Sequence, residues 1–207
     1  MSGVETGRAD TALDAFLALV AEKGFAEVTL RDVAAAADVG LADLYKRHPD
    51  KVSLVSAFLA RTDDSVLAGT PRQVDPEETP RDRLFDVMMR RYDVLKPHRE
   101  ALRAIRRAAT RDPLLALALG PPVRRSMAAM LEAASLSSEG FSGAVRQNGL
   151  LAIDYAVGQV FERDETMDLS KTMAALDGRL KTAERWVQSF ERYTVSRNGN
   201  GTESRAG

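Results

Sequence analysis

The sequence contains no cysteine. This absence excludes disulfide frameworks, thiol nucleophiles and cysteine-ligated zinc sites. Its only two histidines, His48 and His98, lie far apart and lack the spacing of metal ligands, so we expect no metal site and no cofactor. The chain also has no glycine-rich phosphate loop and no G-x-S-x-G nucleophile motif. We therefore predict that the protein is not an enzyme.

Long hydrophobic runs are missing as well. Apolar runs such as Leu114–Leu119 are far too short to span a bilayer, and residues 1–9 lack the apolar core of a signal peptide. Few segments alternate with period two, so helix is favoured over strand. Hydrophobic residues make up 44% of the chain and charged residues 29%, as in ordinary globular proteins. We expect an all-α cytoplasmic protein without stable membrane insertion.

Helical periodicity and stop signals divide the chain into parts. A helix is predicted over residues 10–23, where apolar side chains recur at helical spacing until Gly24 ends the pattern. Residues 69–80 hold three prolines and no apolar cluster, which indicates a linker. We expect one domain over 1–68, the linker over 69–80, a second domain over 81–195 and a disordered tail over 196–207.

The second domain is expected to be helical throughout. The motif Gly120-Pro121-Pro122 predicts a break between two helices, because proline lacks the amide that an α-helix interior uses. The expected helices cover residues 81–95, 98–110, 113–119, 123–134, 141–163 and 169–194.

Residues 29–51 carry the signals of a helix-turn-helix. Thr29–Asp32 has the form of a capping box, residues 38–40 form a tight connection, and a short helix is predicted over Leu41–Arg47. Asp50 then caps a helix over 51–67. A short helix that is braced by its neighbours can enter the major groove of DNA.

The order of these segments resembles a known family. "ALDAFLALVAEKGFAEVTLRDVAAAADV", followed by "LYKRHPDKVSLVSAFL", resembles the N-terminal domain of TetR family transcriptional regulators over about residues 10–60. The resemblance implies a TetR-like homodimer whose N-terminal helices bind operator DNA and whose C-terminal helices form a ligand pocket and a dimer interface. The expected DNA-binding residues are Thr29, Arg31, Gly40, Leu41, Asp43, Tyr45, Lys46 and Lys51. The resemblance places Thr29, Tyr45 and Lys51 at phosphates, and Leu41 and Asp43 near base edges.

The last predicted helix carries apolar residues at alternating spacings of four and three from Leu169 to Phe190. Such a seam packs along another helix, and the helix over 141–163 offers a matching stripe. The spacing alone leaves open whether the two stripes face a partner chain or this chain's own core. For the dimer interface we predict Leu150, Val157, Phe161, Met173, Leu176, Leu180 and Val187.

A small apolar effector is expected between the helices over 81–95, 98–110, 123–134 and 141–163. Methionine suits a variable apolar guest because its side chain is adaptable, although each methionine could equally be plain core. The candidate ligand-binding residues are Met88, Met89, Tyr92, Met127, Met130, Asp154 and Tyr155.

Charge supports an alternative function. Residues 1–68 hold seven basic and eleven acidic side chains, whereas residues 81–130 hold twelve basic and five acidic ones. DNA affinity depends largely on neutralising phosphates. "RLFDVMMRRYDVLKPHREALRAI" and "DLSKTMAALDGRLKTAE" are also similar to TetR-like lipid-binding proteins of ubiquinone biosynthesis. The alternative is a lipid- or isoprenoid-binding protein with a degenerate DNA-reading head. Its anionic-lipid surface would be Arg99, Arg103, Arg106 and Arg107, which otherwise face solvent.

Overall fold

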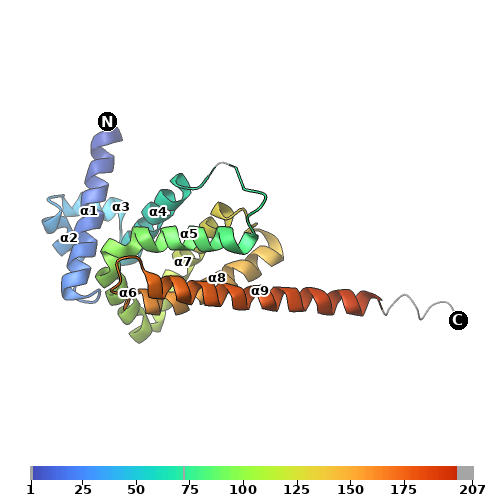
Figure 1. Ribbon diagram of the computed structural model, residues 1–207. Coiled ribbons are helices and arrows are strands. Elements are labelled where there is room, and N and C mark those ends of the chain that lie inside the picture. Colours follow the sequence, from blue (N-terminus) through green and yellow to red (C-terminus); the bar gives the residue numbers. More distant parts are fainter. Residues whose placement is uncertain (1, 72, 200–207) are drawn as a thin grey trace.

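The computed structural model describes the backbone of residues 2–71 and 73–199 and the side chains of residues 11–71 and 73–185. Over this part of the chain the fold is all-helical and contains no strand, as predicted (Figure 1). The elements are α1 (Ser2–Lys23), α2 (Leu30–Ala36), α3 (Leu41–Arg47), α4 (Lys51–Ala68), α5 (Pro80–Leu95), the 3-10 turn η1 (Lys96–His98), α6 (Arg99–Arg111), α7 (Pro113–Ala133), α8 (Gly140–Phe161) and α9 (Ser170–Gly199).

Helices α1, α2 and α3 form the N-terminal head, which lies at one end of the molecule (Figure 1). Local signals set its connections. Gly24 adopts a φ of 88° after α1, a left-handed conformation that favours glycine. Thr29 and Asp32 form the predicted capping box at the start of α2. Leu44 of α3 is fully buried in the head's core, so this short helix is held by an apolar anchor.

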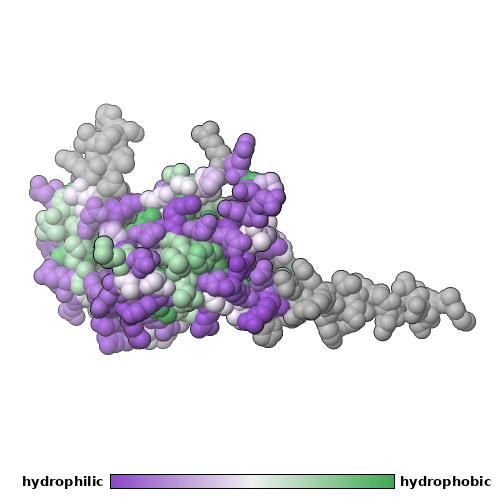
Figure 2. Space-filling model, viewed as in Figure 1, coloured by the Kyte–Doolittle hydropathy of each residue, from purple (hydrophilic) through white to green (hydrophobic). Residues whose placement is uncertain are grey.

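The remaining helices form a larger bundle. Helix α4 runs from the head into this bundle and packs along α7 and α5, while α8 packs on α7 and α9. Helix α1 also packs on α6, which joins the head to the bundle. Hydrophilic residues cover most of the face in Figure 2, and hydrophobic residues gather over its middle, where α5 and α9 lie. None of the described helices has the length and apolar character that crossing a bilayer requires.

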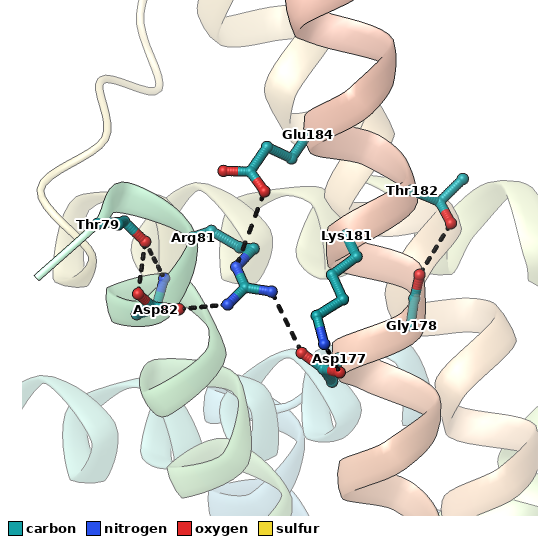
Figure 3. A network of polar contacts seen from close by, with 8 residues as sticks. All are labelled: Thr79, Arg81, Asp82, Asp177, Gly178, Lys181, Thr182 and Glu184. Carbon is teal, nitrogen blue, oxygen red and sulfur yellow. Dashed lines mark hydrogen bonds and ion pairs between the residues drawn. The ribbon is translucent and has the colours of Figure 1, made fainter.

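A polar network fixes the start of α5 against α9 (Figure 3). The Arg81 guanidinium donates to Asp82 of its own helix at 2.7 Å and to Asp177 of α9 at 3.3 Å. Its Nε lies 3.9 Å from Glu184 of α9, and Lys181 pairs with Asp177 at 2.7 Å. Because these groups are spread over two turns of α9, they define how far α9 is shifted along α5.

The predicted helix break at Gly120-Pro121-Pro122 is wrong, because α7 is continuous from Pro113 to Ala133. The two prolines remove the amides that would bond the carbonyls of Leu117 and Ala118. Both of those residues are exposed, so water can satisfy their carbonyls. The opposite face of α7 is buried and packs on α4, and this packing maintains the helix.

Two other boundaries differ from prediction. Helix α1 begins at Ser2 rather than near residue 10, and α9 continues to Gly199, so residues 196–199 are helical rather than disordered. The rest of the predicted tail, residues 200–207, lies outside the described residues. The proposed division at residues 68 and 80 stays a prediction.

Gly143 near the start of α8 gives a sharp stability test. A Cβ at this position would lie 2.2 Å from the carbonyl carbon and oxygen of Ser138, so backbone would have to move. We expect Gly143→Ala to lower the free energy of unfolding by about 1–3 kcal/mol in urea denaturation. The matched control is Gly149→Ala in the same helix, where a Cβ meets nothing within 4 Å and helix propensity predicts a gain of up to about 1 kcal/mol. Equal stabilities for both variants would contradict this packing.

Candidate nucleic-acid interface and ligand cavity

Helix α3 presents most of the predicted DNA-reading side chains to solvent. Leu41, Asp43, Tyr45 and Lys46 are all exposed. Gly40 precedes the helix without a side-chain cap, and the Asp43 carboxylate lies over it, since a Cβ on Gly40 would be 3.3 Å from Asp43 Oδ2. A carboxylate at this place is favoured by the amides at a helix start. Lys46 Nζ lies 3.7 Å from Asp43 Oδ1, so the anion and its neighbouring cation share one surface.

The flanking candidates have local structural roles. Thr29 Oγ1 accepts from the Asp32 amide as the cap of α2, and Arg31 is exposed in the first turn of that helix. Lys51 instead points into the head. Its Nζ donates to the carbonyl of Phe25 at 2.6 Å and to that of Ala26 at 3.3 Å, and it lies 4.6 Å from the centre of the Phe25 ring. Burial lowers the pKa of Lys51. The ammonium predicted to contact phosphate therefore fastens the connection between α1 and α2 to the start of α4.

A cavity of about 640 Å³ lies within the larger bundle. Its walls come from α4, α5, α6, α7 and α8, so the four expected helices are joined by α4. The volume is in the range of sites that bind small molecules. Most of the lining is apolar and includes Phe58, Leu95, Leu102, Ile105, Val123 and Phe161.

Arg91 of α5 is the centre of a buried polar cluster beside this cavity. Its side chain is 3% exposed, and its Nη1 donates to Asp63 Oδ1 of α4 at 3.1 Å and to Ser126 Oγ of α7 at 2.8 Å. The Ser126 hydroxyl donates to the same Asp63 oxygen at 2.5 Å. Burial raises the pKa of Asp63, although Ser126 and Arg91 oppose the shift. Three helices are thus connected through one guanidinium.

Two more polar groups of the cavity come from α8. Tyr92 Oη donates to Asp154 Oδ1 at 3.0 Å, and burial together with this carboxylate raises the pKa of Tyr92 well above its ordinary value. Arg106 of α6 makes a two-pronged contact with the buried Glu162 carboxylate at the end of α8. The hydrogen bond to Glu162 raises the pKa of Arg106.

Some of the predicted ligand-binding residues line the cavity, whereas the predicted methionines belong to the core. Tyr92, Asp154 and Tyr155 line the cavity, but none of the four methionines does. Met88, Met127 and Met130 are fully buried in the core and Met89 is partly buried against it, so they fill space between packed helices. The sequence interpretation missed Arg91, Arg106, Glu162 and the α4 wall. The sequence could have indicated that Arg91 is buried, because it lies on the same helical face as the apolar residues Val87, Met88 and Leu95.

The predicted dimer residues are largely internal. Leu150, Val157, Phe161, Leu176 and Leu180 are at most 4% exposed in the single chain, so their assignment to an interface is wrong. The apolar seam exists, but α8 and α9 use it to pack against each other and against their neighbours within the chain. Met173 is 42% exposed, and the Val187 side chain lies outside the described residues.

The arginines of α6 do not form one solvated face. Arg103 donates to Glu100 and to the carbonyl of Glu162, Arg106 pairs with Glu162, and Arg99 lies 5.0 Å from the Phe161 ring. These cations surround the end of α8, where helix carbonyls favour positive charge. Arg107 stays exposed. The described side chains contain no group of three or more residues suited to hold a metal ion, and the His98 ring packs edge-on against Phe58 at 5.2 Å.

Comparisons with known proteins agree with this architecture. The family model "Bacterial regulatory proteins, tetR family" matches residues 12–58. A TetR transcriptional regulator from Nitrosomonas europaea is 22% identical with a TM-score of 0.68 over 85% of this chain and 97% of that one. A second from Rhodococcus sp. RHA1 is 22% identical with a TM-score of 0.55, over 84% and 96% of the two chains. A third from Streptomyces coelicolor is 19% identical with a TM-score of 0.57, over 100% and 93%. No curated protein matches the sequence.

Proposed function

We propose that the chain, whose residues 12–58 match the TetR family model and whose fold is that of TetR regulators, is a dimeric transcriptional repressor whose DNA binding is controlled by a small, mainly apolar effector. The observation that carries this proposal is α3, which is anchored by one buried leucine and presents its other large side chains to solvent. A short exposed helix braced by α1 and α2 has the shape that enters a major groove.

Two classes of contact are expected on DNA. Tyr45 and Lys46 supply a hydroxyl and an ammonium to phosphates, together with Thr29 and Arg31 beside the start of α2. Leu41 and Asp43 occupy the first turn of α3 and would face base edges, where a carboxylate accepts a hydrogen bond from cytosine. Phosphate contacts set general affinity, and base contacts set the preferred sequence.

These roles predict opposite effects for two neighbouring residues. Lys46→Ala should weaken binding to all DNA sequences and reduce the slope of log affinity against log salt by about 0.9. Asp43→Ala should raise affinity for unrelated DNA, because a negative charge next to phosphates is removed, and should also change the preferred sequence. Fluorescence anisotropy over a salt series, using fragments from around the protein's own gene, measures both effects.

Lys181→Ala is the matched control, since Lys181 also pairs with an aspartate but lies on α9. It should leave DNA binding unchanged. If the wild type binds none of the fragments at low salt, the repressor proposal fails.

Dimerisation is proposed through the outer face of α8 rather than through the seam first predicted. Phe141 and Val145 lie one helical turn apart on this face and are exposed, by 88% and 56%. Exposed apolar side chains in one stripe are typical of an interaction surface. A symmetric dimer would present two α3 helices to an operator with two half-sites.

The effector is proposed to enter the cavity of the larger bundle. The α4 wall of this cavity contains Val55, Phe58 and Leu59, and the same helix begins at the head. A guest that moves α4 therefore changes the position of the head relative to the bundle. An effector that binds one of two such arrangements better shifts the equilibrium between them by its difference in affinity.

Two observations favour lipid binding as a second candidate function. The Lys51 ammonium is engaged within the head, and Asp43 places a negative charge beside Lys46 on α3. Both features reduce the cationic surface available to phosphates. Organic extraction of the purified protein followed by mass spectrometry tests this candidate. A lipid recovered in a one-to-one ratio, together with no DNA binding at low salt, would favour it over the repressor.

A further inference from the structure

Arg91 and Tyr92 of α5 and Asp154 of α8 form one polar group in the lining of the cavity. Tyr92 is 1% exposed and its hydroxyl is already committed to Asp154 Oδ1. Arg91 Nε lies 4.0 Å from the same carboxylate oxygen, which is too long for a hydrogen bond. The Arg91 guanidinium and the Asp154 carboxylate therefore lie close together at the cavity wall, but Arg91 Nε makes no hydrogen bond to Asp154.

Arg91 Nε is a buried donor with no hydrogen-bond partner among the described residues. Nη1 of the same guanidinium donates to Asp63 and Ser126, which hold the side chain in place. No donor contacts Asp154 Oδ2 within the described part of the chain, and the Asp154 side chain is 20% exposed. Buried polar groups nearly always have a partner, so Arg91 Nε marks a place where a guest would present an acceptor, beside the Asp154 carboxylate.

The charged residues around the cavity indicate which kind of polar group a guest would carry. Arg91 pairs with Asp63 at 3.1 Å and reaches Asp154 only at 4.0 Å, while Arg106 pairs with Glu162. These two cations and three carboxylates leave one net negative charge, and Asp154 is the carboxylate least compensated by a cation. A carboxylate guest would be repelled by Asp154 and has no proton to donate to it. An ammonium guest has only donors and would leave Arg91 Nε without an acceptor. A neutral hydroxyl both donates and accepts.

We propose that the cavity selects an apolar molecule bearing a hydroxyl group, an alcohol or a phenol, which donates to Asp154 and accepts from Arg91 Nε. An oxygen about 2.8 Å from both Arg91 Nε and Asp154 Oδ1, which are 4.0 Å apart, satisfies ordinary hydrogen-bond distances. Oδ1 can accept this bond as well as the one from Tyr92. Leu95, Leu102, Ile105 and Phe161 provide apolar contact for the rest of the guest. The inference names the ligand class of the effector site and so rests on the proposed function.

Four probes that share a pentylphenyl group test this selectivity by isothermal titration calorimetry on the full chain. They are 4-pentylphenol, 4-pentylanisole, 4-pentylbenzoate and 4-pentylbenzylamine. We expect the phenol to bind at least about tenfold more tightly than the other three, because one hydrogen bond to a charged group distinguishes them. Asp154→Asn should weaken phenol binding by about 10-fold or more and leave anisole binding unchanged. Asp93→Asn makes the same change at an exposed position of α5 outside the cavity lining and should change neither affinity.

Each failure of the proposal has a distinct result. Equal binding of all four probes, or tightest binding of the benzylamine, overturns hydroxyl selection. No binding of 4-pentylphenol at millimolar concentration overturns it too. DNA binding is measured separately by anisotropy: a wild type that binds DNA but shows no phenol preference refutes this inference alone. A wild type that prefers the phenol but binds no DNA refutes the repressor proposal.

Discussion

Replacing Arg91 with alanine is expected to lower the free energy of unfolding by about 3–5 kcal/mol, the cost of leaving one partner of a buried ion pair behind. Arg91 is 3% exposed and connects α4, α5 and α7 through Asp63 and Ser126. The variant leaves the Asp63 carboxylate buried with the Ser126 hydroxyl as its remaining close donor among these groups. Urea denaturation monitored by circular dichroism measures the loss.

The loss should depend on pH with a defined sign. Burial raises the pKa of Asp63 above its ordinary value of 3.8, so the folded state holds this proton more tightly than the unfolded state does. Stability from this group is therefore greatest below pH 3.8 and falls as the pH rises through the folded pKa. Arg91 lowers the pKa of Asp63, so its removal raises the folded pKa further. The difference in stability between Arg91→Ala and wild type should shrink as the pH falls towards 4.

Arg81→Ala provides the matched comparison, because Arg81 is also an arginine of α5 that contacts carboxylates. Its side chain is 26% exposed and its contacts with Asp177 and Glu184 are accessible to water (Figure 3). Exposed ion pairs contribute little to stability, so Arg81→Ala should lower the free energy of unfolding much less than Arg91→Ala does. This smaller loss should also change little with pH over the range in which Asp63 titrates. Equal losses for the two arginines would show that Arg91 is not the buried link described above.

The head could be predicted from sequence because its signals are local. The boundaries of α2 and α3 agree with those expected from Thr29, Asp32 and Gly40. Each signal acts over three or four residues, through a cap or a turn. Such contacts depend on little beyond the neighbouring chain, and so a pattern of residue types is enough to locate them.

The larger bundle could be predicted only in part, because its decisive contacts are distant in sequence. Arg91 contacts Asp63 and Ser126, which lie 28 and 35 residues away. The heptad pattern identified a real seam, but period alone does not say whether its partner lies in the same chain. The predicted helix break at Pro121-Pro122 was wrong for a related reason: the packing of α7 on α4 outweighed the local tendency of proline to break a helix.

Introducing charge on the outer face of α8 is expected to abolish dimerisation. The double variant Phe141→Asp with Val145→Glu replaces two apolar side chains that are 88% and 56% exposed in the single chain. A twofold interface contains each substitution twice, so the dimer dissociation constant should rise by about 100-fold or more. Folding should be preserved, because neither side chain is buried and an acid near the start of a helix is favourable. Analytical ultracentrifugation over a concentration series measures the change, with circular dichroism to verify helix content.

The consequence for DNA separates this surface from the reading helix. A monomer presents one α3, so binding to an operator with two half-sites should weaken by about 100-fold, while binding to an isolated half-site stays as in the wild type. Met167→Glu is the control: Met167 is an equally exposed apolar residue, at 92%, but lies between α8 and α9 rather than on the α8 stripe. It should leave both assembly and DNA binding unchanged. A double variant that sediments as the wild type does would exclude the outer face of α8 as the interface. A wild type that is monomeric at high micromolar concentration would exclude the dimer itself, because two α3 helices could then reach adjacent half-sites only through separate binding events.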